Sequence, residues 1–332
     1  MKRDKIIVLG SLAFDYIMSF EENFVNAVSI DHEKKEYQST ITANSRIKHF
    51  GGTAGNIAYN LGLLNTSKVS LFGSVGEDFN TLGYKDHISK FQNIDLNVDI
   101  QADLFTAACY IVNDKKSNQM IIFHGGALDE SKNIDLRQKI KDPEHYAFAI
   151  NSTQSIEAMQ NFAKQLSDLG IPMIFDPGQI TPLFSKDNLV DILKKSEILI
   201  GNSFEISQVM KKTDLDEQNI LKLVKTIIKT KGSEGSELIY KTDSEELKRD
   251  KIPIAIPNST VDATGAGDGY RAGFLTGLIL NMKLLDSCRL GSILGSFVVE
   301  TSGAQTQIYD VKSVRTRFQK TYGYIPSELE KF

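Results

Sequence analysis

The stretch STVDATGAGDGYRAGF, Ser259 to Phe274, places a Gly-Ala-Gly turn between two aspartates, directly before the apolar run LTGLIL. The pattern predicts a helix that starts at Gly265–Gly267, where unpaired backbone N–H groups and the helix dipole favour an anion. Asp268, inside the first turn, could then accept the proton of an attacking hydroxyl. Asp262, before the turn, could hold a cation or brace the loop. The plainer interpretation is a glycine-rich helix start in which Asp268 is only a first-turn charge.

Four other stretches carry residues suited to the same kind of site. Gly10–Asp15 (GSLAFD) places a carboxylate just after the first expected strand. Phe50–Gly62 (FGGTAGNIAYNLG) is another glycine turn that opens a helix, with Asn56 in its first turn. Gly201–Glu205 (GNSFE) combines an amide and a carboxylate at a strand end, and Lys229–Ser236 (KTKGSEGS) is a glycine loop after an expected helix. Taken singly, these stretches are more simply interpreted as a hinge, an N-cap, a capping arrangement and a β-turn.

Short apolar runs alternate with helical patterns along most of the chain. This alternation predicts right-handed βαβ units and an α/β fold with a central, mostly parallel sheet covered by helices on both faces. The expected strands are KIIVLG, KVSLFGSVG, YAFAIN, IPMIFDPG, SEILIGN and SELIYK. The expected helices are Ala54–Leu64, Asp78–Phe91, Ser155–Leu169, Leu189–Lys195, Phe204–Lys211, Asp216–Lys229, Gly265–Leu280 and Leu284–Thr301. Ligands of such sheets bind beyond the carboxyl ends of the strands, which directs attention to Asp15, Asp176, Asn202 and Gly265.

Two segments, 20–50 and 97–123, depart from this alternation. They contain the strand-like pieces STITANSRIKHF, FTAACYIVND and NQMIIFHG without a long helix between them. Strands that leave the main sheet could form a small separate sheet over its edge. Such a sheet would be either a flap over a binding site or an insertion without a role in binding.

Composition excludes several classes of protein. The 332 residues carry a net charge of −4 at pH 7, which argues against a dedicated nucleic-acid binder. Two cysteines, Cys109 and Cys288, are too few for a disulfide framework and fit a reducing cytoplasm. No apolar run approaches the roughly 18 residues of a membrane span, and Asp15 interrupts the apolar N-terminus, which argues against a signal peptide.

No P-loop motif is present. Metal-ligand spacing is absent among His32, His49, His87, His124 and His145, of which His49 and His124 are the best candidates to line a flap.

In combination and in this order, GGTAGN, GNSFE, KTKGSEGS and DATGAGDGYRAGF resemble the ribokinase-like (PfkB) family of sugar and nucleoside kinases. The resemblance extends from about Ile6 to Tyr322. The stretches GSLAFDYIMSF, FHGGALDESKNIDL, FDPGQ, AGFLTG and LGSILGSFVVETSGAQ are most similar to bacterial adenosine kinases of the mycobacterial type. The resemblance implies a ribokinase-like fold in which residues 1–332 form a single kinase domain. It also implies a small β-sheet lid, built from about 16–50 and 97–124, through which members of the family often form homodimers.

The resemblance further implies ATP-dependent transfer of the γ-phosphoryl group to the 5′-hydroxyl of a nucleoside. Adenosine, giving AMP as in purine salvage, is the first candidate acceptor. The matching catalytic residues are Asp268 as general base and Gly265, Ala266 and Gly267 as anion hole. The matching substrate-binding residues are Asp15, Ser11, Gly52, Asn56, Phe123 and Gln179. The matching nucleotide-binding residues are Asn202, Thr230, Gly232 and Gly235. The matching metal-binding residues are Glu205, which acts on Mg²⁺ through water, and Asp262, which helps to bind a monovalent cation such as K⁺ in many members.

Two positions depart from the adenosine-kinase pattern. Cys109, in TAACYI, replaces a lid aromatic, and stacking on an aromatic is worth about 1–3 kcal/mol per base. Ile180, in DPGQIT, replaces a second glutamine that reads the base, which leaves base edges unpaired or suits another base. A sugar kinase of the same fold is therefore an alternative. A nucleoside-binding relative without catalysis is a second alternative, against which the intact Asp268 and its glycine turn argue.

Overall fold

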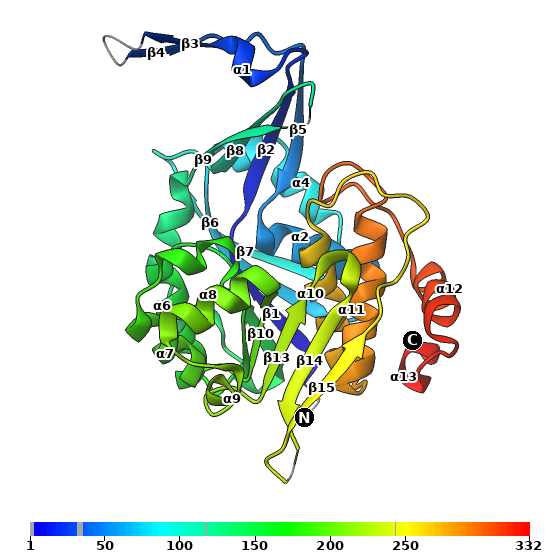
Figure 1. The fold of residues 1–332 in the computed structure, drawn as a ribbon. Coiled ribbons are helices and arrows are strands. Elements are labelled where there is room, and N and C mark those ends of the chain that lie inside the picture. Colours follow the sequence, from blue (N-terminus) through cyan, green and yellow to red (C-terminus); the bar gives the residue numbers. More distant parts are fainter. Residues whose placement is uncertain (1–2, 32–35, 117, 243) are drawn as a thin grey trace.

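The computed structural model describes residues 3–31, 36–116, 118–242 and 244–332. Its centre is a nine-stranded sheet with the order β15-β14-β13-β12-β11-β10-β1-β6-β7 (Figure 1). The strands from β13 to β7 are parallel, whereas β14 and β15 run antiparallel to their neighbours. The strand bounds are β1 Lys5–Leu9, β6 Lys68–Gly76, β7 Ile94–Gln101, β10 Tyr146–Asn151, β11 Met173–Phe175, β12 Ile198–Asn202, β13 Thr226–Thr230, β14 Ser236–Lys241 and β15 Leu247–Ile252. The expected α/β fold with a mostly parallel sheet is confirmed.

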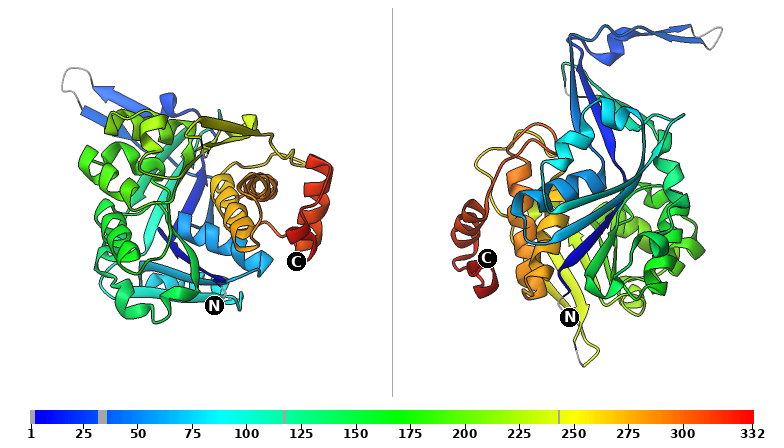
Figure 2. Two further views of the ribbon diagram at one scale, coloured as in Figure 1. Left: turned by 90° about the horizontal axis from the view of Figure 1, so that it is seen from below. Right: turned by 180° about the vertical axis from the view of Figure 1, so that it is seen from behind.

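Alternating side chains give this sheet two apolar faces. In β1, Ile6 and Val8 belong to one buried cluster, whereas Ile7 and Leu9 belong to the other. Helices α2 (Thr53–Leu64), α10 (Ala266–Ile279) and α11 (Leu284–Val298) cover the first face. Helices α6 (Ile156–Asp168), α7 (Lys186–Lys194) and α8 (Ser203–Thr213) cover the second (Figures 1 and 2). Because both faces are buried, the central strands consist of nearly continuous apolar runs.

A second sheet of four strands, in the order β5-β2-β8-β9, stands beyond one end of the main sheet (Figure 1). Its strands are β5 Ser45–Gly51, β2 Ala13–Ser19, β8 Ala107–Asn113 and β9 Gln119–His124. The expected small separate sheet is therefore present. It begins at Ala13 instead of residue 16, and residues 97–101 of the expected lid range belong to β7 in the main sheet, where they pair with β6.

An arm extends from the outer end of this small sheet (Figures 1 and 2). It contains helix α1 (Phe24–Ala27) and the antiparallel pair β3 (Val28–Asp31) and β4 (Glu36–Ser39). His32 and the rest of 32–35, which fall in the expected lid range, lie outside the described residues.

The expected helix over Asp216–Lys229 is wrong. Only α9 (Glu217–Ile220) is helical there, and β13 (Thr226–Thr230) occupies a central position in the sheet. Its β-branched residues Thr226, Ile227 and Ile228 are buried, which suits a pleated surface between two neighbours. The glycine loop KTKGSEGS therefore follows a strand and connects it to β14, and does not follow a helix.

The expected helix over Asp78–Phe91 is divided. Gly83 adopts a φ of 85° between α3 (Asp78–Thr81) and α4 (Tyr84–Ser89), which ends the first helix and starts the second. The other expected helices and strands are present within a few residues of the expected ends. Among the described residues, none of the helices is both long and apolar enough to cross a bilayer.

Candidate active site

Helix α10 begins at the Gly-Ala-Gly turn. Gly265 precedes the helix with a φ of 79°, and a Cβ at this position would lie 2.4 Å from the Cβ of Ala304. Only glycine fits both the backbone conformation and the close approach of the neighbouring loop. The first N–H groups of a helix have no partners within it, so this turn presents donors and a positive dipole end to an anion.

Asp268 lies in the first turn of α10 and is partly accessible to solvent. Its Oδ2 atom accepts a hydrogen bond of 2.7 Å from Nδ2 of Asn56. Desolvation raises the pKa of Asp268 to about 7, although Arg271 and the Asn56 amide act in the opposite direction. Asp176 and Glu205 contribute further to the increase. A carboxylate with a pKa near neutrality is suited to accept a proton from a hydroxyl.

Asn56 comes from the first turn of α2, whose start is held by Ser11. The backbone N–H of Ala54 donates to the carbonyl of Ser11 at 3.0 Å, and the N–H of Thr53 donates to its hydroxyl at 3.0 Å. Gly52 precedes the helix with a φ of 85°. The first turns of α2 and α10 are therefore joined through Asn56 and Asp268, although 212 positions separate these residues in the chain.

Asp15 lies near the start of β2, an inner strand of the small sheet. Burial raises the pKa of Asp15 to about 6, with a smaller contribution from the Asp262 carboxylate. A Cβ placed on Gly51 would lie only 2.3 Å from Oδ2 of Asp15, so the carboxylate rests against the backbone just before α2. A second carboxylate therefore stands next to the turn that carries Asn56.

Strand register places four side chains in one row across the small sheet. Asp15 pairs with His49 on β5 and with Cys109 on β8, and Cys109 pairs with Phe123 on β9. Residues that pair across strands project from the same face, so His49, Cys109 and Phe123 share the face of Asp15. Phe123 is 54% exposed on the edge strand. His124 pairs with Ala108 and lies on the opposite face, so it does not line the same surface.

Arg271 is a site residue that the motifs did not reveal. Its guanidinium donates to both carboxylate oxygens of Asp176 at 2.5 Å, and the two side chains are 7% and 1% exposed. Its Nη1 donates to the carbonyl of Gly267 at 2.9 Å, and its Nη2 lies 3.8 Å from Oε2 of Glu205. The signal in the sequence was an arginine within the apolar helix YRAGFLTGLIL, because a buried cation requires an anionic partner.

A model of the pfkB family of carbohydrate kinases matches residues 12–310. The chain belongs to this family. A nucleoside kinase of Methanothermobacter thermautotrophicus is 31% identical over 343 residues, which cover 98% of this chain and 99% of that protein. The solved nucleoside kinase of Methanocaldococcus jannaschii, an archaeal member of the ribokinase family, is 29% identical and covers 96% of this chain and 99% of its own, with a TM-score of 0.84. The Burkholderia thailandensis nucleoside kinase in complex with inosine is 28% identical and covers 97% and 99%, with a TM-score of 0.82.

These likenesses confirm the expected ribokinase-like fold. Membership of the pfkB family makes the chain a phosphotransferase that acts on an alcohol group.

The motifs GNSFE and KTKGSEGS meet at the ends of the neighbouring strands β12 and β13. Asn202 and Glu205 form a capping box at the start of α8, in which each side chain accepts from the backbone N–H of the other. Thr230 pairs with Asn202 across β12 and β13. The next turn contains Gly232 and Gly235, and a Cβ on Gly235 would lie 2.1 Å from the carbonyl oxygen of Ile252. Desolvation raises the pKa of Glu205.

Ion pairs engage the two lysines beside this turn. Lys229 and Arg249 both bind the carboxylate of Glu217, and Lys231 donates to Glu237 at 2.6 Å. These ion pairs join β13 to α9 and the glycine turn to β14.

Asp262 braces the loop before α10. Its two carboxylate oxygens accept from the backbone N–H groups of Thr264, at 2.9 Å, and Gly303, at 3.1 Å. Desolvation opposes ionisation, but these N–H donors lower the pKa of Asp262 overall. Within the described part of the chain, no group of three or more His, Cys, Asp or Glu side chains could hold a metal by itself.

The two positions near the expected base differ in exposure. Gln179 is exposed in a short 3₁₀ helix, Gly178–Leu183, that follows Asp176. Ile180 is half-buried and packs against the second apolar cluster, so its side chain contributes to the core.

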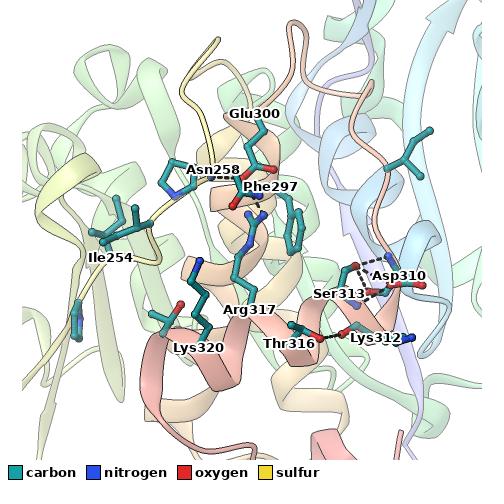
Figure 3. Close-up of a pocket in the computed structure, with 15 residues that line it drawn as sticks. Ile254, Asn258, Phe297, Glu300, Asp310, Lys312, Ser313, Thr316, Arg317 and Lys320 are labelled. Atoms are coloured by element: carbon teal, nitrogen blue, oxygen red, sulfur yellow. Dashed lines mark hydrogen bonds and ion pairs between the residues drawn. The ribbon is translucent and has the colours of Figure 1, made fainter.

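A cavity of about 950 Å³ lies between segment 253–258, α11 and helix α12 (Val311–Tyr322) (Figure 3). Arg317 lines the cavity, pairs with Glu300 at 2.9 Å and lies over the ring of Phe297. None of the residues around Asp268 lines this cavity. The joined starts of α2 and α10, and not this cavity, therefore carry the residues suited to phosphoryl transfer.

Proposed function

We propose that this pfkB-family kinase transfers the γ-phosphoryl group of ATP to the 5′-hydroxyl of a nucleoside, with adenosine as the first candidate acceptor and AMP as its product. The single observation that carries the proposal is the position of the Asp268 carboxylate in the first turn of α10, where desolvation raises its pKa to about 7. The relatives add support, since those of M. thermautotrophicus and M. jannaschii are nucleoside kinases and that of B. thailandensis has been solved with inosine.

In the proposed reaction, Asp268 accepts the proton of the 5′-hydroxyl as its oxygen attacks the γ-phosphorus. The bond between the γ-phosphorus and the bridging oxygen of ADP breaks, and ADP leaves. The N–H groups of the Gly265–Gly267 turn stabilise the charge on the transferred phosphoryl group. Little covalent chemistry is asked of the protein, so positioning and charge stabilisation supply most of the acceleration.

We assign the acceptor to the space between the small sheet and the two helix starts. Asp15, with Gly52 and Asn56, would bind the ribose hydroxyls, and Ser11 would hold the turn that carries them. Phe123 would stack on the base and Gln179 would contact its edge. Within a single kinase domain formed by residues 1–332, the small sheet would act as a lid that excludes water from the reacting phosphate.

The nucleotide would lie along the ends of β12 and β13, against Asn202, Thr230, Gly232 and Gly235. Mg²⁺ usually retains several waters and binds through substrate phosphates and one or two carboxylates. The Glu205 carboxylate, just after the end of β12, fits such a water-mediated contact, and the ion would neutralise phosphate charge. Asp262, whose pKa is lowered, is our candidate to bind a monovalent cation such as K⁺.

We further propose that the kinase is a cytoplasmic homodimer that pairs through its small sheet. All six residues of β9 are exposed, and an exposed edge strand is a template for pairing with a second copy. Both cysteines are free, which suits a reducing compartment.

A sugar kinase is the second candidate, and the small Cys109 in the row of Asp15 and Phe123 is the observation that favours it. Because a cysteine stands next to Phe123 in that row, it offers less ring surface for stacking on a base than a second phenylalanine would.

The discriminating experiment measures ADP release with adenosine, inosine, other nucleosides, ribose and fructose, each with and without K⁺. We expect the highest kcat/KM with a purine nucleoside and a 5′-monophosphate as product. A preference for ribose or fructose would establish the sugar kinase instead. Tight nucleoside binding without turnover of any acceptor would establish a non-catalytic binding protein.

A further inference from the structure

A chain of buried hydrogen bonds runs from the end of the small sheet to the proposed base. Tyr84 donates its hydroxyl hydrogen to the carbonyl of Gly51 at 2.6 Å. Nε2 of Gln305 donates to the Tyr84 oxygen at 2.7 Å and to Oδ1 of Asn56 at 2.9 Å. The Asn56 amide then donates to Asp268. Tyr84, Asn56 and Gln305 are 0%, 5% and 3% exposed, so water has little access to these bonds.

The direction of each bond follows from the one before it. A phenol has a single hydrogen, and Tyr84 uses it on Gly51, so its oxygen can only accept from Gln305. Gln305 must therefore present its NH₂ group to Tyr84 and Asn56. Asn56 in turn must present its oxygen to Gln305, which leaves its NH₂ group for Asp268. Burial raises the pKa of Tyr84 well above its usual range, so the phenol keeps its hydrogen.

We propose that Gln305 and Tyr84 are positioning residues that fix the amide of Asn56 with its NH₂ group toward Asp268. Neither residue contacts the acceptor or the phosphate in this scheme, and the inference rests on the proposed role of Asp268 as base. With Asn56 reversed, an amide oxygen would face the carboxylate, and two acceptors cannot share a hydrogen bond. The reversed amide would favour the protonated form of Asp268, which cannot act as a base.

Other groups around Asp268 do not provide this control. Arg271, on the same helix, is bound to both oxygens of Asp176, and Glu205 faces the site from α8. These charges do not change when Gln305 is replaced. His87, which faces Gln305 from α4, is neutral near pH 7 because burial lowers its pKa to about 4. The Asn56 amide is thus the adjustable neighbour of Asp268.

Both positions are buried, so substitution will also reduce stability, and the test must separate stability from positioning. Gln305→Met keeps the length of the side chain and removes its donors, and Tyr84→Phe removes only the hydroxyl. Gln165→Met is the matched control. Gln165 is 7% exposed in α6 and bonds the backbone of Ile134 and Leu136, far from Asp268 in the second core.

The measurement is kcat/KM of the full chain against pH, with the best acceptor of the panel. In Gln305→Met we expect the acidic limb to move up by about one pH unit, since a hydrogen bond to a charged group is worth about that much in protonation equilibrium. Activity should fall about tenfold at pH 6 and approach the wild-type value above pH 9. Tyr84→Phe should shift the limb in the same direction by less, and Gln165→Met should leave it in place while unfolding at lower urea.

A Gln305→Met profile that coincides with the wild type, with stability reduced as in Gln165→Met, would overturn the inference. Absence of turnover in the wild type would instead refute the proposed function. The inference can then still be tested without turnover. The measurement is the difference in unfolding free energy between Asp268→Asn and the protein with Asp268 intact, taken at several pH values. In the Gln305→Met background, the upper end of the pH range over which this difference grows should rise by about one unit, while the lower end, set by the unfolded chain, stays in place. An unchanged upper end would overturn the inference.

Discussion

Replacing Asp268 by Asn should stabilise the protein at pH 8 while it removes most of the activity. Desolvation raises the pKa of Asp268 from 3.8 to about 7, so between these values the folded state keeps a proton that the unfolded chain has lost. The wild type therefore loses stability from this group as pH rises from about 4 to about 7, and recovers none of it above. Asn does not titrate and avoids this loss.

The size of the effect follows from the pKa difference. About three pKa units at 1.36 kcal/mol each amount to about 4 kcal/mol, as an upper limit at pH 8. At pH 4 the contribution is close to zero. Asn keeps an oxygen that can accept from the Asn56 amide, so the contacts of the side chain are largely preserved. The loss of the base should lower kcat about 10²- to 10⁴-fold.

Urea unfolding of both proteins at pH 4.5, 6 and 8, with single-turnover phosphoryl transfer at pH 8, measures the two effects. The difference in unfolding free energy should grow with pH in favour of Asp268→Asn. Asp103→Asn, on an exposed turn, is the control and should show no such trend. A difference that is constant with pH would refute the desolvation of Asp268, and full activity of the variant would refute its role as base.

Three further outcomes are expected. Arg271→Met leaves Asp176 buried without its cation and should lower the unfolding free energy by about 3–5 kcal/mol in urea titrations, with part of the loss recovered when Asp176→Asn is added. Phe123→Ala should raise KM for nucleosides about tenfold to a hundredfold by loss of stacking and leave KM for ribose unchanged, as steady-state kinetics would show. Excess EDTA should abolish turnover with ATP but leave the unfolding temperature of the protein without ATP unchanged. The reason is that the described residues contain no group of side chains that could hold a metal by itself. A lower unfolding temperature would reveal a structural metal.

The parallel sheet could be predicted because its strands carry their own signature. Runs such as KIIVLG and YAFAIN are apolar at successive positions, which is what burial on both faces requires. The segment Asp216–Lys229 misled because its Leu, Lys and Ile residues also satisfy a helical spacing. Thr226–Thr230 is a strand because β12 and β14 bind it on both sides, and such pairing between distant segments is not encoded locally.

The motifs of the site could be predicted for a similar reason, since each is a short local structure. The turn at Gly265 and the capping box of Asn202 and Glu205 are formed by neighbours in the chain. Arg271 and Asp176 are 95 residues apart, and Gln305 and Asn56 are 249 apart. Partners at such separations are brought together only by the completed fold, so no pattern within one motif could reveal them.

The distribution of charge around Asp268 explains why a neutral side chain can control it. Arg271 is a cation that interacts with this carboxylate, but its guanidinium also binds both oxygens of Asp176. Arg271 and Asp176 are therefore close to a neutral pair, and Glu205 adds a further carboxylate to the neighbourhood. Arg271 still favours the ionised form of Asp268, and two further groups do the same: the dipole of α10 and the Asn56 amide. Both are dipoles of fixed direction, and a dipole helps the carboxylate only while it is held the right way round. The helix itself fixes the direction of the α10 dipole. The direction of the Asn56 amide is fixed by the hydrogen bonds that run from Gly51 through Tyr84 and Gln305.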